Sequence, residues 1–154
     1  MSNTNYDSID IEYSYCGDYE VSDDGDFQDT TYDQIQSLVQ EIQTVCNSSI
    51  GDWQENPNYA ASLTDYVGEP NNRITSRNIT DRIKTSLIGN NVVRADDLTI
   101  NIIPIDRYKV FILVSVKVAS TQNNSVLTDG SVVVSLVFDY TEQGISFIDN
   151  ATQY

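Results

Sequence analysis

The stretch 94–118, RADDLTINIIPIDRYKVFILVSVKV, decides the fold, because apolar residues begin here to recur with a period of two. Two such runs, LTINIIPI (98–105) and YKVFILVSVKVA (108–119), flank Asp106 and Arg107, and this pattern predicts a hairpin of half-buried strands. Pro104 has no N–H to donate to a neighbouring strand, so we expect it near a strand end or on an edge. Two more strands are predicted at 131–140 and 145–149.

Between residues 31 and 89, apolar residues recur at three- and four-residue spacing, which is typical of helices with one buried face. A first helix is predicted over 31–47. A second is predicted to begin at Asn56, with Pro57 at its first position, and to end at Gly68. A third is predicted to begin at Thr75 or Ser76 and to end at Gly89. The sequence therefore predicts an α+β fold, with three N-terminal helices packed on an antiparallel β-meander.

The charge of the chain is unevenly distributed along its length. The formal net charge is −15 at pH 7, and the first basic residue is Arg73. Residues 1–72 contain fifteen acidic residues, whereas 73–154 contain eight acidic and eight basic residues. An acidic surface of this kind repels nucleic acid and anionic membranes and favours a basic protein surface. We therefore expect protein partners, with no nucleic acid and no membrane.

The N-terminal segment 1–30 is predicted to be an extended acidic arm, followed by a domain over 31–154. Within the arm, Ile9, Ile11, Tyr13 and Tyr15 alternate with polar residues, which indicates a half-buried strand. The pattern gives the arm one apolar face, and this face requires a docking surface either on the chain's own domain or on a neighbouring subunit.

Several classes of protein are disfavoured by the sequence. There is no apolar run of about 18 residues and no signal-peptide pattern, so we expect the chain to stay in the cytoplasm where it is made. Cys16 and Cys46 are expected to be reduced thiols. The chain has no His, and the acidic run SDDGDFQD (22–29) lacks the glutamate that closes a regular calcium-binding loop, because Thr31 takes that position. We expect no metal site and no cofactor.

Catalysis is difficult to build from these residues. Without His, a Ser or Cys nucleophile lacks its commonest general base. A pair of carboxylates, as in glycoside hydrolysis, is the chemistry that the composition still allows, with candidates at Asp52, Glu55, Asp65 and Glu69. Each candidate has a simpler role before a helix or on a polar surface. We therefore expect no enzyme and no catalytic residue.

Three pieces of the sequence also match a known pattern in their order. They are GDWQENPNYAASL (51–63), the predicted third helix, and the stretch 94–118. A glycine–acid loop with a proline and an aromatic residue comes first, followed by an arginine, a leucine and a hairpin of the form V-N-V-I-P-V, matched here by Arg94, Leu98 and 100–105. Over about residues 31–149 the chain resembles the small baseplate wedge proteins of contractile phage tails. This sheath-initiator family, also labelled lysozyme-like, is shared with type VI secretion systems.

The resemblance implies a structural subunit that joins the wedge core to the tail tube or sheath and initiates sheath assembly. Such a protein is assembled in the host cytoplasm and resides in the virion, in the tail baseplate. The implied partners are other wedge subunits with their helical core bundle, and the tail sheath protein or the tail tube.

This sequence departs from the family pattern at two places. The family's Glu-Pro-Arg signature, which contacts the core bundle, appears here as Val92–Val93–Arg94, and Ala60 replaces the glycine after the loop aromatic. The resemblance implies that Arg94 still binds a partner. We expect the arm to bind a neighbouring subunit through its apolar residues Ile9, Ile11, Tyr13 and Tyr15.

Two alternative functions stay open at this stage. The acidic composition is compatible with a DNA-mimic inhibitor of a host nuclease or restriction factor, although the neutral half 73–154 argues against it. A peptidoglycan-cleaving lysozyme that uses the carboxylates of 52–69 is the other alternative.

Overall fold

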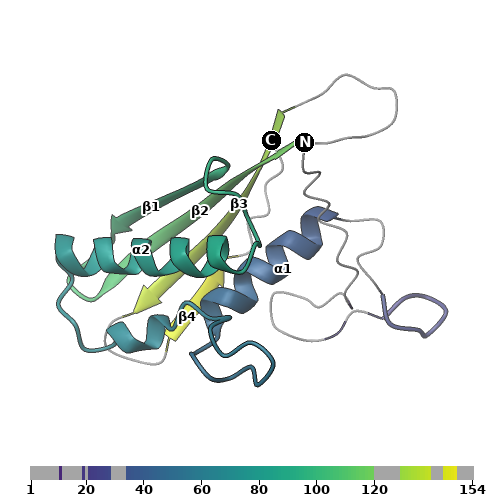
Figure 1. The fold of residues 1–154 in the computed structure, drawn as a ribbon, viewed down its shortest axis with the longest axis horizontal. Helices are drawn as coiled ribbons and strands as arrows, with labels where there is room; N and C mark the ends of the chain where they lie inside the picture. The colour runs from purple at the N-terminus through teal and green to yellow at the C-terminus, as the bar shows by residue number, and fades with distance from the viewer. Residues whose placement is uncertain are drawn as a thin grey trace.

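The computed structural model describes residues 11, 19, 21–28, 34–119, 129–139 and 144–148. Within these ranges, two α-helices precede one antiparallel sheet, and a short 3-10 helix lies between the helices. The elements are α1 (Gln34–Asn47), η1 (Leu63–Tyr66), α2 (Arg73–Gly89), β1 (Leu98–Pro104), β2 (Lys109–Ala119), β3 (Asp129–Asp139) and β4 (Gly144–Ile148). Each strand pairs with its neighbour in sequence, in the order β1-β2-β3-β4. Figure 1 shows α1 and α2 packed on the same side of this sheet.

The predicted hairpin around Asp106 and Arg107 is confirmed. Strand β1 pairs with β2 in the register Leu98↔Val116, Ile102↔Ile112 and Pro104↔Val110. At the tip, the carboxylate of Asp106 accepts a hydrogen bond from the Tyr108 N–H (2.6 Å). The Asn71 side-chain amide donates to the Asp106 carbonyl oxygen (2.7 Å) and thereby holds the tip against the segment before α2.

The predicted layer of three N-terminal helices on a meander is wrong, because the described chain has two α-helices there. The segment 56–68, predicted as the second helix, is irregular apart from η1. The backbone of this segment forms hydrogen bonds to α1 and to Ser48, the residue after α1. The Ala61 N–H donates to the Val45 carbonyl oxygen (2.9 Å), and the Ser62 N–H donates to the Ser48 carbonyl oxygen (3.1 Å). Ser62 also has a left-handed backbone (φ 46°), which interrupts a helix.

Helix α2 begins earlier than predicted because its cap is Asn72. The Asn72 side-chain oxygen accepts hydrogen bonds from the N–H groups of Ile74 (2.8 Å) and Thr75 (3.0 Å), which would otherwise be unpaired at the helix start. The helix ends at Gly89 as predicted. Neither helix in the described ranges has the length and apolar character needed to cross a lipid bilayer.

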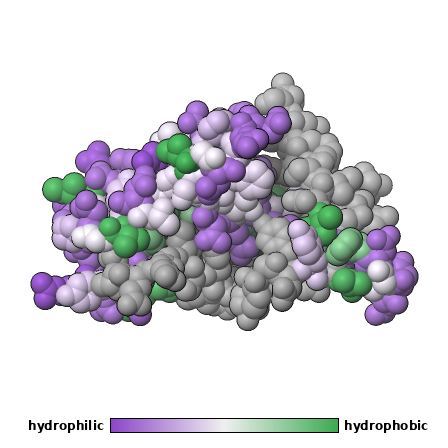
Figure 2. Space-filling view, turned by 90° about the horizontal axis from the view of Figure 1, so that it is seen from below, coloured by the Kyte–Doolittle hydropathy of each residue, from purple (hydrophilic) through white to green (hydrophobic). Residues whose placement is uncertain are grey.

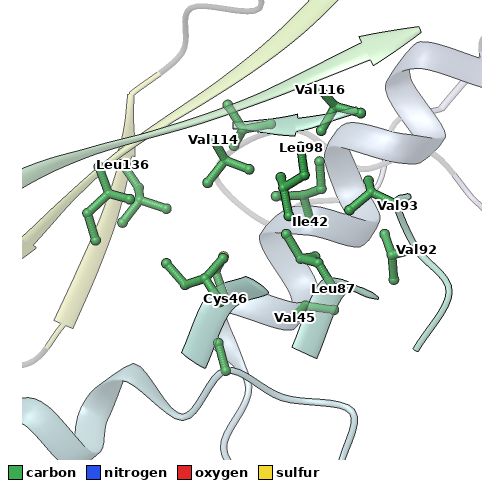
Figure 3. Packing of buried hydrophobic residues seen from close by; sticks show 14 of the residues in the cluster. Ile42, Val45, Cys46, Leu87, Val92, Val93, Leu98, Val114, Val116 and Leu136 are labelled. Carbon is green, nitrogen blue, oxygen red and sulfur yellow. The ribbon is translucent and has the colours of Figure 1, made fainter. Parts of the chain in front are cut away.

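The core lies between the helices and the inner face of the sheet. Every second residue of β2 points into it, and these residues are Val110, Ile112, Val114 and Val116. In Figure 3, Ile42 of α1 lies next to Leu98 of β1, and Val45 of α1 lies next to Leu87 of α2. The buried hydroxyl of Ser86 donates to the Ala60 carbonyl oxygen (2.5 Å), so the irregular segment is fixed to α2 as well as to α1.

Cys46 is part of this core and is a free thiol. Burial raises the pKa of the Cys46 thiol from 9.0 to about 12, because the apolar surroundings disfavour the thiolate. The folded-state pKa is therefore higher than that of an exposed thiol. Burial of the protonated thiol stabilises the fold fully below about pH 9, and this contribution is lost as the pH rises from 9 toward 12.

Two isoleucines of α2 offer a matched test of this packing. Ile83 is fully buried, whereas Ile74 is 73% exposed. Changing Ile83 to Ala is expected to lower the free energy of unfolding by about 2–5 kcal/mol, because the change removes buried methyl groups and leaves a cavity. The same change at Ile74 is expected to shift it by less than about 0.5 kcal/mol. Urea unfolding followed by circular dichroism measures both, and equal losses would contradict the described orientation of α2.

The Cys46 thiol is expected to be unreactive in the folded protein. In a Cys16→Ser variant, a thiol reagent at about pH 8 should leave Cys46 unmodified in buffer and should modify it fully in urea, since only unfolding exposes and ionises the thiol. Rapid modification without any change in circular dichroism would show that Cys46 is accessible in the folded state.

Candidate functional site

Arg94 lies in the turn that connects α2 to β1. The N–H groups of Val92 and Val93 both donate to the Leu87 carbonyl oxygen (2.9 and 3.3 Å), and both valine side chains are buried. The chain leaves the core at Arg94, which is exposed. The Asp97 N–H then donates to the Arg94 carbonyl oxygen (3.1 Å), so the backbone of the turn is fixed while the Arg94 side chain points outward.

The guanidinium of Arg94 makes no ion pair with any residue that the structure describes. The ion pairs in these ranges are Arg77–Asp81 (3.8 Å), Arg82–Asp65 (3.3 Å) and Lys109–Asp139 (3.5 Å). The Arg94 side chain is therefore exposed and has no ion pair among the described residues. Val92 and Val93 pack in the core and thereby anchor the turn.

Strand β1 forms one edge of the sheet, and its outer side has no partner in the described part of the chain. In an antiparallel pair, every second residue of a strand forms hydrogen bonds to the neighbouring strand through its N–H and C=O groups. Because β1 pairs only with β2 among the described strands, the N–H and C=O groups of its other residues point away from β2. No hydrogen bond within the described ranges reaches them. Thr99, Asn101, Ile103 and Pro104 are also exposed, which leaves this edge accessible.

Ile11 is the one predicted arm contact that falls in the described ranges; Ile9, Tyr13 and Tyr15 lie outside them. The Ile11 carbonyl oxygen accepts a hydrogen bond from the side-chain amide of Gln40 (3.2 Å), a buried residue of α1. This contact attaches residue 11 to the chain's own domain. That the arm binds a neighbouring subunit stays a prediction. The role of Gln40 was not predicted, because a single polar residue within a helical stripe gives no signal of its partner.

The four carboxylates considered for glycoside hydrolysis lie in different surroundings, and all are exposed. Asp52 accepts a hydrogen bond from the Ser49 N–H (2.7 Å), and Asp65 pairs with Arg82. Glu69 lines a shallow cavity of about 480 Å³ between the segment 67–71 and the hairpin tip at 107–108. A glycosidase needs one carboxyl group in an apolar pocket that keeps it protonated. None of these four has such surroundings.

The acidic run 22–29 forms a tight turn in its described part. The Ser22 N–H donates to the Asp26 carbonyl oxygen (2.9 Å), and Val21 pairs with Phe27 across the turn. The Ser22 hydroxyl donates to the Asp24 carboxylate, and this hydrogen bond lowers the pKa of Asp24. Figure 1 shows the turn beyond α1 and away from the sheet. Among the described residues, no cluster of three or more His, Cys, Asp or Glu could hold a metal ion.

Exposed apolar side chains are spread over several elements. On the face shown in Figure 2, hydrophobic residues form small separate groups among hydrophilic ones. The large apolar side chains exposed in the described ranges are Ile11, Tyr19, Val21, Phe27, Ile50, Trp53, Val67, Ile74, Ile103, Ile105 and Tyr108. Single exposed residues of this kind are ordinary on protein surfaces, so their exposure alone does not indicate a binding site.

Comparisons with known proteins do not assign the chain to a family. No model of a protein family matches the sequence, and neither the curated proteins nor the solved structures include a match.

Proposed function

We propose that the chain is a non-enzymatic structural subunit of a contractile-tail baseplate wedge, which joins the wedge core to the tail tube or sheath and initiates sheath assembly. The observation that supports this proposal is the outer edge of β1, which pairs with no other described strand, with the exposed Arg94 four residues before it. The sequence resemblance supplies the identity of the partners.

The free edge of β1 suits a partner that arrives as an extended arm. The strand is seven residues long, and its outward N–H and C=O groups can form a new ladder with an added strand. Each added hydrogen bond contributes roughly 0.5–1.5 kcal/mol in net terms. In the proposed assembly this arm belongs to a tail sheath subunit.

Charge supports the choice of a partner other than a second copy. Two copies that each carry a net charge of −15 repel one another, which opposes pairing of β1 with β1. Arg94 is one of the eight basic residues of this acidic chain, all of which lie in 73–154. In the proposed wedge, its guanidinium binds a carboxylate or a helix C-terminus of the core bundle, where a cation is favoured.

Replacing Arg94 with Ala tests the contact with the wedge core. The variant is expected to assemble at least about tenfold more weakly with wedge subunits, because a hydrogen bond to a charged group is worth roughly 1.5–3 kcal/mol. Its urea midpoint should equal that of the wild type, since Arg94 has no ion pair in the described ranges. The measurement is co-purification with coexpressed wedge and sheath subunits.

Arg107→Ala provides the control, since it removes the same charge from the exposed hairpin tip. An equal loss of assembly in both variants would attribute the effect to net charge and not to the Arg94 contact. Unfolding of the isolated Arg94→Ala protein would make Arg94 an internal structural residue. Co-purification with a host DNA-binding enzyme in place of wedge subunits would favour the DNA-mimic alternative.

The purified protein is expected to be inactive on peptidoglycan, since its loop carboxylates are exposed and have separate roles. A zymogram against heat-inactivated protein measures this. Lysis by the wild type that disappears in Glu55→Gln or Glu69→Gln would overturn the structural role in favour of a muramidase.

A further inference from the structure

The loop 48–57, which follows α1, is closed by hydrogen bonds at several points. The Gly51 N–H donates to the Pro57 carbonyl oxygen (3.0 Å), and the Asp52 N–H donates to the Ser49 carbonyl oxygen (3.1 Å). The Ile50 N–H donates to the Ser62 hydroxyl (2.7 Å). These bonds give the loop one defined shape although it contains no helix or strand.

Ser62 contributes to this shape at an energetic cost. Its backbone is left-handed (φ 46°) and it is buried, which is uncommon for a residue that is not glycine. Such strain persists only where the surrounding structure holds the residue in place, and it concentrates at functional positions. Here the strained residue directs its hydroxyl at the Ile50 N–H. The buried segment 60–63 thus holds the loop in place.

The loop presents the only tryptophan of the chain on the surface. Trp53 is 47% exposed and Ile50 is 51% exposed. The Trp53 ring N–H donates to the Ser48 hydroxyl (3.1 Å), and the ring packs edge-to-face on Tyr59 with 5.9 Å between centroids. A tryptophan whose orientation is fixed before binding loses little entropy on contact, which is typical of the residues that dominate protein interfaces.

The charged residues of the loop itself are all acidic. Asp52 and Glu55 lie in the loop itself, and no Lys or Arg occurs before Arg73. The indole face attracts cations, and Arg is found over such rings more often than Lys. We propose that the loop 48–57 is a docking surface for a basic segment of another protein, in which an apolar side chain contacts Ile50 and Trp53 while flanking Arg or Lys residues face the acidic loop. This surface is additional to the proposed function: in Figure 1 the segment that follows α1 lies at the bottom of the view, whereas β1 lies at the upper left.

Binding of short labelled peptides to the purified full chain tests the proposal. The probe alternates Arg with Leu; one control peptide has Glu in place of Arg, and a second has Ser in place of Leu. Fluorescence anisotropy measures binding. Emission of Trp53, the only tryptophan, should shift to shorter wavelength as the probe covers it. We expect the Arg–Leu peptide to bind at least about tenfold more tightly than either control peptide.

Variants of the chain locate the binding surface. Ile50→Ser combined with Trp53→Ser should weaken binding of the Arg–Leu peptide at least about tenfold. The matched control combines Val67→Ser with Ile74→Ser, which removes two exposed apolar side chains outside the loop and should leave binding unchanged. Glu55→Lys reverses one exposed loop charge and should weaken binding while the circular dichroism spectrum stays that of the wild type. If the Ile50→Ser/Trp53→Ser protein does not fold, the Glu55→Lys variant still tests the proposal.

Three results of the binding measurements would overturn the proposal. They are equal binding of the Glu–Leu or Arg–Ser peptide, equal loss in the control variant, and unchanged binding by the folded Glu55→Lys protein. A Trp53-dependent dimer of the chain without any peptide, seen by sedimentation, would also overturn it, because the occupant would then be a second copy.

Discussion

The packing of α1 and α2 on one face of the sheet is the constraint on which the rest of the structure depends. Ile42 of α1 and Ile83 of α2 meet the inward residues of β2 in a single core. Because side chains alternate between the two faces of a strand, a shift of one residue would turn the inner residues of β2 outward. The core therefore fixes the register of the hairpin. It also fixes the position of β1 at an edge and of Arg94 just before it.

The elements that the sequence predicts well are those whose stability comes from side-chain burial. The hairpin and α1 show their buried faces directly in the spacing of apolar residues. The predicted helix 56–68 failed for a different reason. Asn56, Pro57 and the apolar spacing are the same signals that a real helix gives, but the N–H groups of Ala61 and Ser62 bond to the end of α1 and to Ser48. Apolar spacing reports which face is buried and says nothing about backbone partners.

Some features of the candidate sites could also be predicted from the sequence, and others could not. The exposure of Arg94 after two buried valines follows from polarity, and the place of Pro104 at the end of β1 follows from its missing N–H. The contact between Gln40 and the Ile11 carbonyl oxygen joins residues that are 29 positions apart, and no local pattern encodes it. Ser62 is a similar case. Its left-handed backbone breaks the preference of its residue type, so the closed shape of the loop 48–57 depends on tertiary contacts that the sequence does not display.

The proposed surfaces use two kinds of recognition with different physical consequences. An added strand on β1 would bind through backbone groups, which every partner sequence possesses, so the edge supplies affinity with little selectivity. Arg94 and Trp53 would supply selectivity through charge and shape. Salt separates these contributions: exposed charges are screened within about 10 Å at 0.1 M ionic strength, whereas a backbone ladder is largely insensitive to it. On a chain with a net charge of −15, the proposed side-chain surfaces would therefore supply most of the discrimination between partners, while the edge of β1 would add affinity.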